Sequence, residues 1–88
     1  MSCAVTWTAT AARALQRMPE KVATAAVDFI YGSLAENPQS AGKPVRFELE
    51  GLHSARRGDY RVVYEIDVTE ATVTIIAIQH RADVYRPR

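Results

Sequence analysis

The sequence predicts an α+β fold in which two N-terminal helices pack on one face of a small, mainly antiparallel β-sheet. Two observations lead to this prediction. Apolar residues recur at helical spacing within residues 11–36, whereas β-branched and aromatic residues alternate with polar ones in several segments of residues 45–78. Helices followed by a run of strands are typical of α+β layers, because the strands pair with one another and the helices cover one face.

The first elements expected along the chain are a strand and a helix. Residues 4–9, AVTWTA, alternate in polarity and resemble a short strand. Thr8 or Thr10 can then cap a helix over residues 11–18, because a threonine hydroxyl accepts a hydrogen bond from a free amide of the first turn. Pro19 suits the first turn of a second helix and interrupts the first one, so we expect the chain to bend there.

A second helix is expected over residues 20–36. Its apolar residues recur three or four positions apart and form one stripe that should pack against the sheet: Val22, Ala26, Phe29, Ile30 and Leu34. Gly32 weakens a helix interior by about 1 kcal/mol relative to alanine, so we expect an irregular last turn. Residues 37–44, NPQSAGKP, have the proline, glycine and asparagine content of a loop.

The second half of the chain predicts antiparallel strands. Residues 53–57 and 60–67 resemble two strands around a turn at RGD, and residues 72–78, TVTIIAI, resemble a third. The last two of these strands are close enough in sequence to pair as a hairpin. Residues 45–50, VRFELE, alternate as a strand would, but they could also form a short connection before the turn at Gly51.

Residues 1–88 are expected to form a single cytoplasmic domain. Their 48% hydrophobic and 24% charged content is that of a globular protein and excludes a disordered chain. Cys3 is the only cysteine, which excludes an internal disulfide and a multi-cysteine zinc site. The N-terminus lacks the apolar core of a signal peptide, and no stretch reaches the roughly 18 apolar residues that span a membrane.

The charge is unevenly distributed, although the net charge is only +1. Residues 51–64 and 79–88 together carry six arginines against Asp59 and Asp83, which gives +4 and leaves −3 on the rest of the chain. Such segregation is a weak indication of a polyanionic partner, because the local potential matters more than the sum of charges.

Alternation along residues 60–67 predicts a cationic surface. If Tyr60 and Tyr64 face the helices, Arg61 emerges on the opposite, open face of the sheet, and Arg56 on the preceding strand can converge with it. The tail that follows the last strand would bring further polar groups to the same face: His80, Arg81 and Tyr85. Arginine suits a phosphate because its planar fork binds two oxygens and stays charged.

This set of residues could cleave RNA without a metal. A general base would take the proton of a ribose 2′-OH, which attacks the adjacent phosphate, while arginines stabilise the transition-state charge and an acid protonates the departing 5′-oxygen. His80 is a candidate for that acid or base, because imidazole groups in general can exchange protons near neutral pH. Metal-assisted cleavage is disfavoured, because Asp and Glu do not cluster near the arginines. Taken singly, each arginine could instead be a solvated surface residue, and Tyr85 could pack on the sheet edge.

Three sequence runs resemble the RelE family of toxins from bacterial toxin–antitoxin pairs: GKP at 42–44, LEGLHSARRGDYRVVYEID at 49–67 and HRADVYR at 80–86. The helical pair before them also matches, so the resemblance covers essentially the whole chain. It implies a compact sheet with two N-terminal helices and ribosome-dependent cleavage of mRNA in the A site. It also implies no metal or organic cofactor, and a RelB-like antitoxin that wraps the toxin and blocks the basic face.

The resemblance also implies roles for individual residues. Arg61 and Arg81 match arginines that stabilise the phosphate and the transition state, and Tyr85 matches a tyrosine that acts near the 2′-OH or stacks on a base. With His80 they make up the expected catalytic set. The residues expected to contact RNA are Lys43, Arg56, Arg57 and Arg86. Family members with lysines on the preceding strand, or a glutamate after the GKP-like loop, differ from this chain, which has HSAR and Val45 there. The general base is therefore not assigned by inheritance.

The sequence is also compatible with two other functions. ParE-type toxins are similar in fold and inhibit DNA gyrase without ribonuclease residues. A catalytically weak toxin would act mainly by binding its antitoxin, and would reach operator DNA only through that complex. Arg61, Arg81 and Tyr85 favour the RelE-like function over the gyrase inhibitor.

Overall fold

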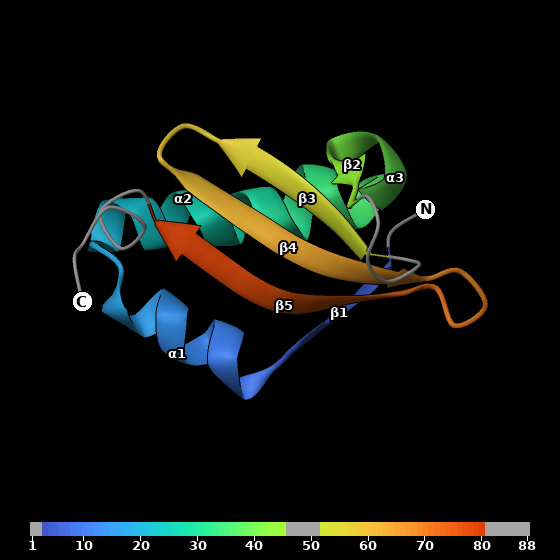
Figure 1. Ribbon diagram of the computed structural model, residues 1–88, viewed down its shortest axis with the longest axis horizontal. Coiled ribbons are helices and arrows are strands. Elements are labelled where there is room, and N and C mark those ends of the chain that lie inside the picture. The colour runs from blue at the N-terminus through green and yellow to red at the C-terminus, as the bar shows by residue number, and fades with distance from the viewer. Residues whose placement is uncertain (1–2, 46–51, 81–88) are drawn as a thin grey trace.

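Figure 1 shows the computed structural model, which describes residues 3–45 and 52–80 as a β-sheet with helices packed on one face. The sheet has five strands in the order β1-β5-β4-β3-β2. The strands are β1 (Ala4–Trp7), β2 (Lys43–Pro44), β3 (Leu52–Arg57), β4 (Tyr60–Asp67) and β5 (Thr72–His80). The helical elements are α1 (Ala9–Arg17), α2 (Glu20–Phe29), the π-helical turn η1 (Ile30–Leu34) and α3 (Pro38–Ala41). The predicted α+β fold is therefore confirmed.

Strands β3, β4 and β5 form the antiparallel unit that the sequence predicted. The first strand, β1, lies on the far side of β5 and pairs with it in parallel, with Val5 opposite Val73. The prediction of a loop over residues 37–44 was wrong in part, because α3 and the two-residue strand β2 occupy most of it. The possible strand over residues 45–50 lies almost wholly outside the described residues.

The hydroxyl of Thr8, rather than that of Thr10, starts helix α1. Its Oγ1 accepts a hydrogen bond from the Ala11 amide at 3.1 Å, which satisfies one of the free donors of the first turn. The same hydroxyl lies 3.1 Å from the Ile75 carbonyl and 3.0 Å from that of Ile76, to which it can donate its proton. One side chain thus fixes the start of α1 against the middle of β5.

The second helix has the irregular last turn that Gly32 predicted. Regular α-helix ends at Phe29, and η1 continues it as one π-helical turn, a rare conformation. The apolar stripe still faces the sheet, because Ala26, Ile30 and Leu34 are fully buried. None of the helices in residues 3–45 and 52–80 has both the length and the apolar character that crossing a bilayer requires.

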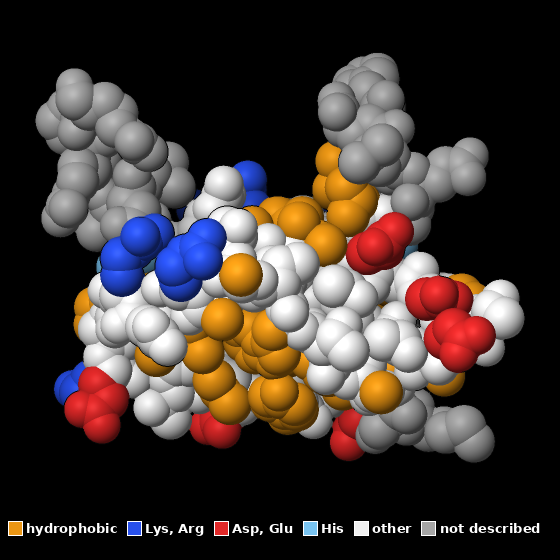
Figure 2. Space-filling model, turned by 90° about the horizontal axis from the view of Figure 1, so that it is seen from below, with side chains coloured by type: hydrophobic (Ala, Val, Ile, Leu, Met, Phe, Trp, Pro, Cys, Tyr) orange, Lys and Arg blue, Asp and Glu red, His pale blue; other side chains and the backbone are white. Residues whose placement is uncertain are grey.

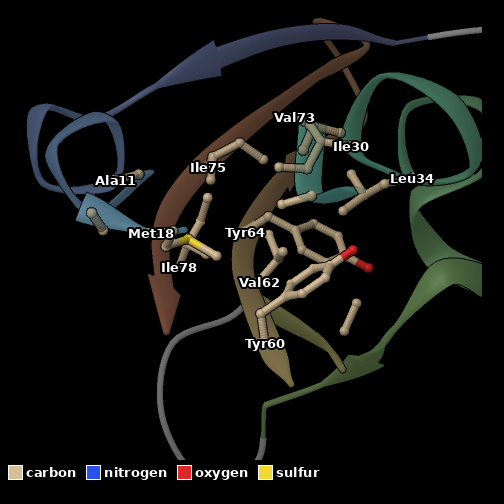
Figure 3. Close-up of a cluster of buried hydrophobic side chains, with 13 residues drawn as sticks. Ala11, Met18, Ile30, Leu34, Tyr60, Val62, Tyr64, Val73, Ile75 and Ile78 are labelled. Carbon is tan, nitrogen blue, oxygen red and sulfur yellow. The ribbon is translucent and has the colours of Figure 1, made fainter. Parts of the chain in front are cut away.

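The core lies between the helices and one face of the sheet, which we call the helix face (Figure 3). Tyr64, Val62, Val73 and Ile75 from the sheet are fully buried there. Figure 3 shows the helix side chains, among them Ile30, packing against these strand residues. Burying apolar surface at about 25 cal/mol per Å² is the main stabilising term, so this face of β4 and β5 cannot carry charge without a large cost.

Tyr64 ties the core to the segment that carries α3 and β2. Its hydroxyl donates a 2.6 Å hydrogen bond to the carbonyl of buried Pro38, and its ring stacks on that of His53 with centroids 5.6 Å apart. Gly42 passes directly over this hydroxyl. A Cβ placed on Gly42 would lie 2.7 Å from the Tyr64 oxygen and 2.6 Å from the Ser54 carbonyl oxygen.

We expect Gly42→Ala to lower the free energy of unfolding by about 1–3 kcal/mol, because the new methyl group must displace the backbone of β3. Gly32→Ala is the matched control, since nothing lies within 4 Å of its added Cβ and alanine is the better helix former. Urea unfolding of both variants measures the difference. Equal stability of the two variants would show that the chain can move away from β3 at Gly42 at no cost.

Burial raises the pKa of Tyr64 to about 12, an effect that the nearby Arg57 charge partly opposes. The unfolded chain releases this proton near the ordinary tyrosine value of about 10. Stability from Tyr64 is therefore complete below about pH 10 and is lost as the pH rises towards 12. We expect Tyr64→Phe, which leaves the Pro38 carbonyl unpaired, to be less stable at pH 8 but to lose less stability between pH 9 and 11. Parallel stability–pH curves for the two proteins would contradict this assignment.

Candidate nucleic-acid interface

Strand register places three of the expected RNA-contacting and catalytic residues together on the face of the sheet that points away from the helices, the open face. Arg56 on β3 lies directly opposite Arg61 on β4. Lys43 on β2 lies opposite Ser54, which is two residues from Arg56 and therefore on the same face. Directly opposite residues have Cβ atoms about 4.5–5.5 Å apart, and diagonal neighbours about 7–8 Å. We call Lys43, Arg56 and Arg61 the cationic end.

The cationic end carries positive charges that no described residue neutralises. All three side chains are exposed, and no hydrogen bond or ion pair joins any of them to another residue of 3–45 and 52–80. Like charges directly opposite each other on a sheet repel and lower its stability. A bound phosphate would relieve this repulsion, because a guanidinium forms paired, charge-assisted hydrogen bonds with phosphate oxygens.

The structure separates Arg57 and His80 from the cationic end. Arg57 is opposite Tyr60, and Tyr60 is opposite His80, so all three side chains leave the sheet on the helix face. The Arg57 guanidinium lies 4.6 Å from the centroid of the Phe29 ring. The expectation that His80 lies on the same face as Arg61 was therefore wrong. The face on which the His80 side chain lies depends on how β5 pairs with β4, and the sequence alone does not fix that register.

Tyr60, whose side chain also lies on the helix face, has a raised pKa. Burial raises the pKa of its hydroxyl, the Arg57 charge lowers it, and the Asp28 charge raises it again. The hydroxyl donates a long hydrogen bond of 3.4 Å to the Ala25 carbonyl. Tyr60 thus remains protonated at neutral pH and links β4 to α2.

Three other predicted site residues, Arg81, Tyr85 and Arg86, lie outside the described residues. In contrast, the register identifies a polar residue that the sequence analysis missed. Gln79 on β5 is exposed and directly opposite Arg61, so it extends the row from Arg56 across a third strand. The signal in the sequence is only the two-residue alternation of β5, which becomes useful once its pairing with β4 is known.

The cationic end can bind and stabilise an anion, but its described residues provide no obvious acid or base. Ser54 and Gln79 are its polar neighbours, and neither titrates near neutral pH. In residues 3–45 and 52–80, His, Cys, Asp and Glu side chains form no group of three or more that could hold a metal ion. The chemistry that this arrangement supports is electrostatic stabilisation of a phosphate.

The sequence of this chain is similar to a toxin family and to two curated toxins. The sequence model of the family described as "ParE toxin of type II toxin-antitoxin system, parDE" matches residues 5–85. "Toxin RelE" of Mycobacterium tuberculosis (strain ATCC 25618 / H37Rv) is 62% identical over 79 residues, which cover 90% of this chain and 81% of that protein. "Toxin RelG" of the same organism is 46% identical over 86 residues, which cover 98% of this chain and 99% of that protein.

Solved structures of toxins with related names also match this chain. The toxin–antitoxin complex RelBE2 from Mycobacterium tuberculosis contains a chain that matches with a TM-score of 0.88 and 43% identity, over 92% of this chain and 100% of that one. The isolated E. coli RelE toxin matches with a TM-score of 0.77 over 96% of this chain and 92% of that one. Its 17% identity supports the fold alone.

The opposite surroundings of Arg56 and Arg57 predict opposite effects on stability. Arg56→Gln removes repulsion from Arg61 and should raise the free energy of unfolding by roughly 0.2–1 kcal/mol. Arg57→Gln removes the contact with the Phe29 ring and should lower it by about 0.5–1 kcal/mol. Urea unfolding at low and high salt measures both, and added salt should shrink the gain for Arg56→Gln. A loss of stability in Arg56→Gln would mean that the guanidinium has a stabilising partner in the free protein.

Proposed function

Because this chain belongs to the RelE/ParE family of toxins from type II toxin–antitoxin systems, we propose that it is an mRNA endoribonuclease that acts on the ribosome. It would cleave mRNA in the A site and so inhibit translation and arrest growth. The observation that carries this proposal is the Arg56–Arg61 pair, exposed on a rigid sheet without an anionic partner among the described residues. This pair is suited to a phosphodiester, and the 2′-OH that makes cleavage possible is present in RNA and absent from DNA.

The proposed reaction is metal-independent transesterification. A base removes the proton from the 2′-OH, the 2′-oxygen forms a bond to phosphorus, and the bond from phosphorus to the 5′-oxygen breaks. The departing oxygen takes a proton, and a 2′,3′-cyclic phosphate remains on the upstream fragment. Arg61 and Arg56 would stabilise the extra negative charge on the phosphoryl oxygens in the transition state. Stabilisation that exists only in the transition state accelerates the chemical step.

Dependence on the ribosome is consistent with the side chains around the cationic end. Its described residues supply positive charge, but no acid or base that titrates near neutral pH. His80 faces the helices, and Tyr85, which is expected to act near the 2′-OH or to stack on a base, is outside the described residues. We infer that ribosomal RNA positions the 2′-OH for in-line attack and supports proton transfer, because correct orientation alone can lower a barrier by several kcal/mol.

The proposed protein partner is a RelB-like antitoxin, which would carry the complex to operator DNA. Two of the solved neighbours, RelBE2 and the intact E. coli RelBE complex, are toxin–antitoxin complexes. The surface supports such a partner, because Figure 2 shows apolar side chains gathered in a strip across the face on which α1 lies. Among the described residues, Tyr31 has 54% of its surface exposed, and it accepts a 2.9 Å hydrogen bond from the Trp7 indole. Aromatic residues with a polar tip are enriched at protein interfaces.

Primer extension on a defined mRNA tests the proposal. Purified protein is added to programmed ribosomes or to the same mRNA alone, and the cleavage sites are mapped. Cleavage within the A-site codon only when ribosomes are present is the expected result. Intact mRNA in the presence of folded protein would contradict the proposal, and a DNA supercoiling assay would then test gyrase inhibition.

We expect Arg61→Ala to slow single-turnover cleavage on ribosomes by roughly 100- to 1,000-fold, the range seen when one transition-state donor is removed. Arg13→Ala is the charge-matched control, because Arg13 is exposed on α1 and outside the open face. Cleavage rates at saturating protein separate the chemical step from binding. A normal rate for Arg61→Ala would remove Arg61 from the proposed catalytic set.

A further inference from the structure

The open face carries opposite charges at its two ends. The cationic end lies towards the β3–β4 turn. Three acidic side chains, Glu65, Asp67 and Glu70, lie at the other end, on β4 and in the β4–β5 turn. We call them the acidic end. Figure 2 shows a group of acidic side chains at the end of the molecule where Figure 1 has the β4–β5 turn.

The acidic end lies in the path of a polyanion that would follow β4 away from the cationic end. Glu65 is four residues from Arg61 on the same strand and the same face, which is about 13 Å at a rise of about 3.3 Å per residue. This separation exceeds the Debye length of about 8 Å at physiological salt, so Glu65 acts little on a phosphate held at Arg61 itself. An RNA strand that ran along β4 from Arg61 would, however, bring its next phosphates within that length of Glu65 and then of Asp67, which repel them.

A path across the strands meets no such repulsion. From β2 to β5 the open-face residues along this path are positive or neutral: Lys43 and half-buried Ser54 face each other, and Arg56, Arg61 and Gln79 form the next row, two residues along the strands. Adjacent strands are about 4.8 Å apart, so four strands offer a track of roughly 14 Å. Gln79 ends the track with an amide that can both donate and accept hydrogen bonds.

We propose that a single strand of RNA crosses the open face perpendicular to the β-strands, from Lys43 on β2 over Arg56 and Arg61 to Gln79 on β5. The acidic end sets this direction by excluding phosphates from the rest of the face. Glu65 and Asp67 are thus specificity-determining residues that act by repulsion, and Gln79 contacts the RNA. This inference rests on the proposed function, because it assumes that the polyanion is RNA.

The test compares two positions on the open face of β5. Gln79→Cys and Thr74→Cys, each in a Cys3→Ser background, are labelled with a thiol-reactive photo-crosslinker and mixed with short oligouridine at low salt. Thr74 is the matched control, because it is on the same strand and face but opposite Glu65. We expect RNA crosslinks at position 79 and few at position 74. Stronger crosslinking at position 74 would overturn the proposed path.

Two further measurements test the charges. The slope of log Kd for oligouridine against log salt concentration should fall by about 0.7 in Lys43→Gln and in Arg56→Gln, because each substitution removes one phosphate contact. Lys21→Gln, on α2 and away from the open face, should leave the slope unchanged. An unchanged slope for Lys43→Gln would remove β2 from the path. Neutralising the acidic end with Glu65→Gln, Asp67→Asn and Glu70→Gln should make crosslinks appear at position 74. An unchanged crosslinking pattern in that variant would show that the acidic end does not set the direction.

These binding measurements need neither ribosomes nor cleavage, so their outcome is separate from that of primer extension. Crosslinking at position 79 without cleavage on ribosomes would support the path and reject the endoribonuclease. Cleavage on ribosomes together with crosslinking at position 74 would support the endoribonuclease and reject the proposed path. If oligouridine does not bind at low salt but an acidic peptide does, the open face is a protein-binding surface and the RNA path is wrong.

Discussion

The two-residue alternation of side chains along β4 is the constraint on which the rest of the structure depends. Val62 and Tyr64 are fully buried against the helices, so the residue between Tyr60 and Val62 has to point away from the core. The same packing that stabilises the domain therefore holds Arg61 on the open face. A one-residue slip in register would bury Arg61 without a partner, which is far more costly than any contact that it makes in solution.

The exposed cations are expected to lower the stability of the free protein, because like charges that face each other across two strands repel. Arg56 and Arg61 face each other across β3 and β4, where a neutral residue at either position should give a more stable sheet. Their neighbour Arg57 differs, because its guanidinium lies 4.6 Å from the centroid of the Phe29 ring on the helix face. Functional sites commonly retain such unfavourable local interactions, which ligand binding relieves.

The sequence was sufficient for the fold class, because helical and alternating periodicity report directly on which residues are buried. The sequence also predicted correctly that Arg61 and Arg56 lie on the open face, because the tight turn between β3 and β4 fixes how these two residues pair. The face of His80 was missed, because it depends on the long-range register between β4 and β5, where an irregularity occurs between Val63 and Tyr64. Gln79 was missed for the same reason. The short elements α3 and β2 depend on the Tyr64 hydroxyl and on close approach at Gly42, which local composition does not indicate.

The central claim is that the Arg56–Arg61 pair holds the phosphate that is cleaved. Its most direct test is a structure of this protein on a programmed ribosome, with a 2′-O-methyl group in the A-site codon to block attack. The account predicts that the scissile phosphate lies within hydrogen-bonding distance of both guanidinium groups, with the RNA strand crossing β4 rather than following it. A scissile phosphate held on the helix-facing side by Arg57 and His80, or beyond reach of the open face, would contradict it.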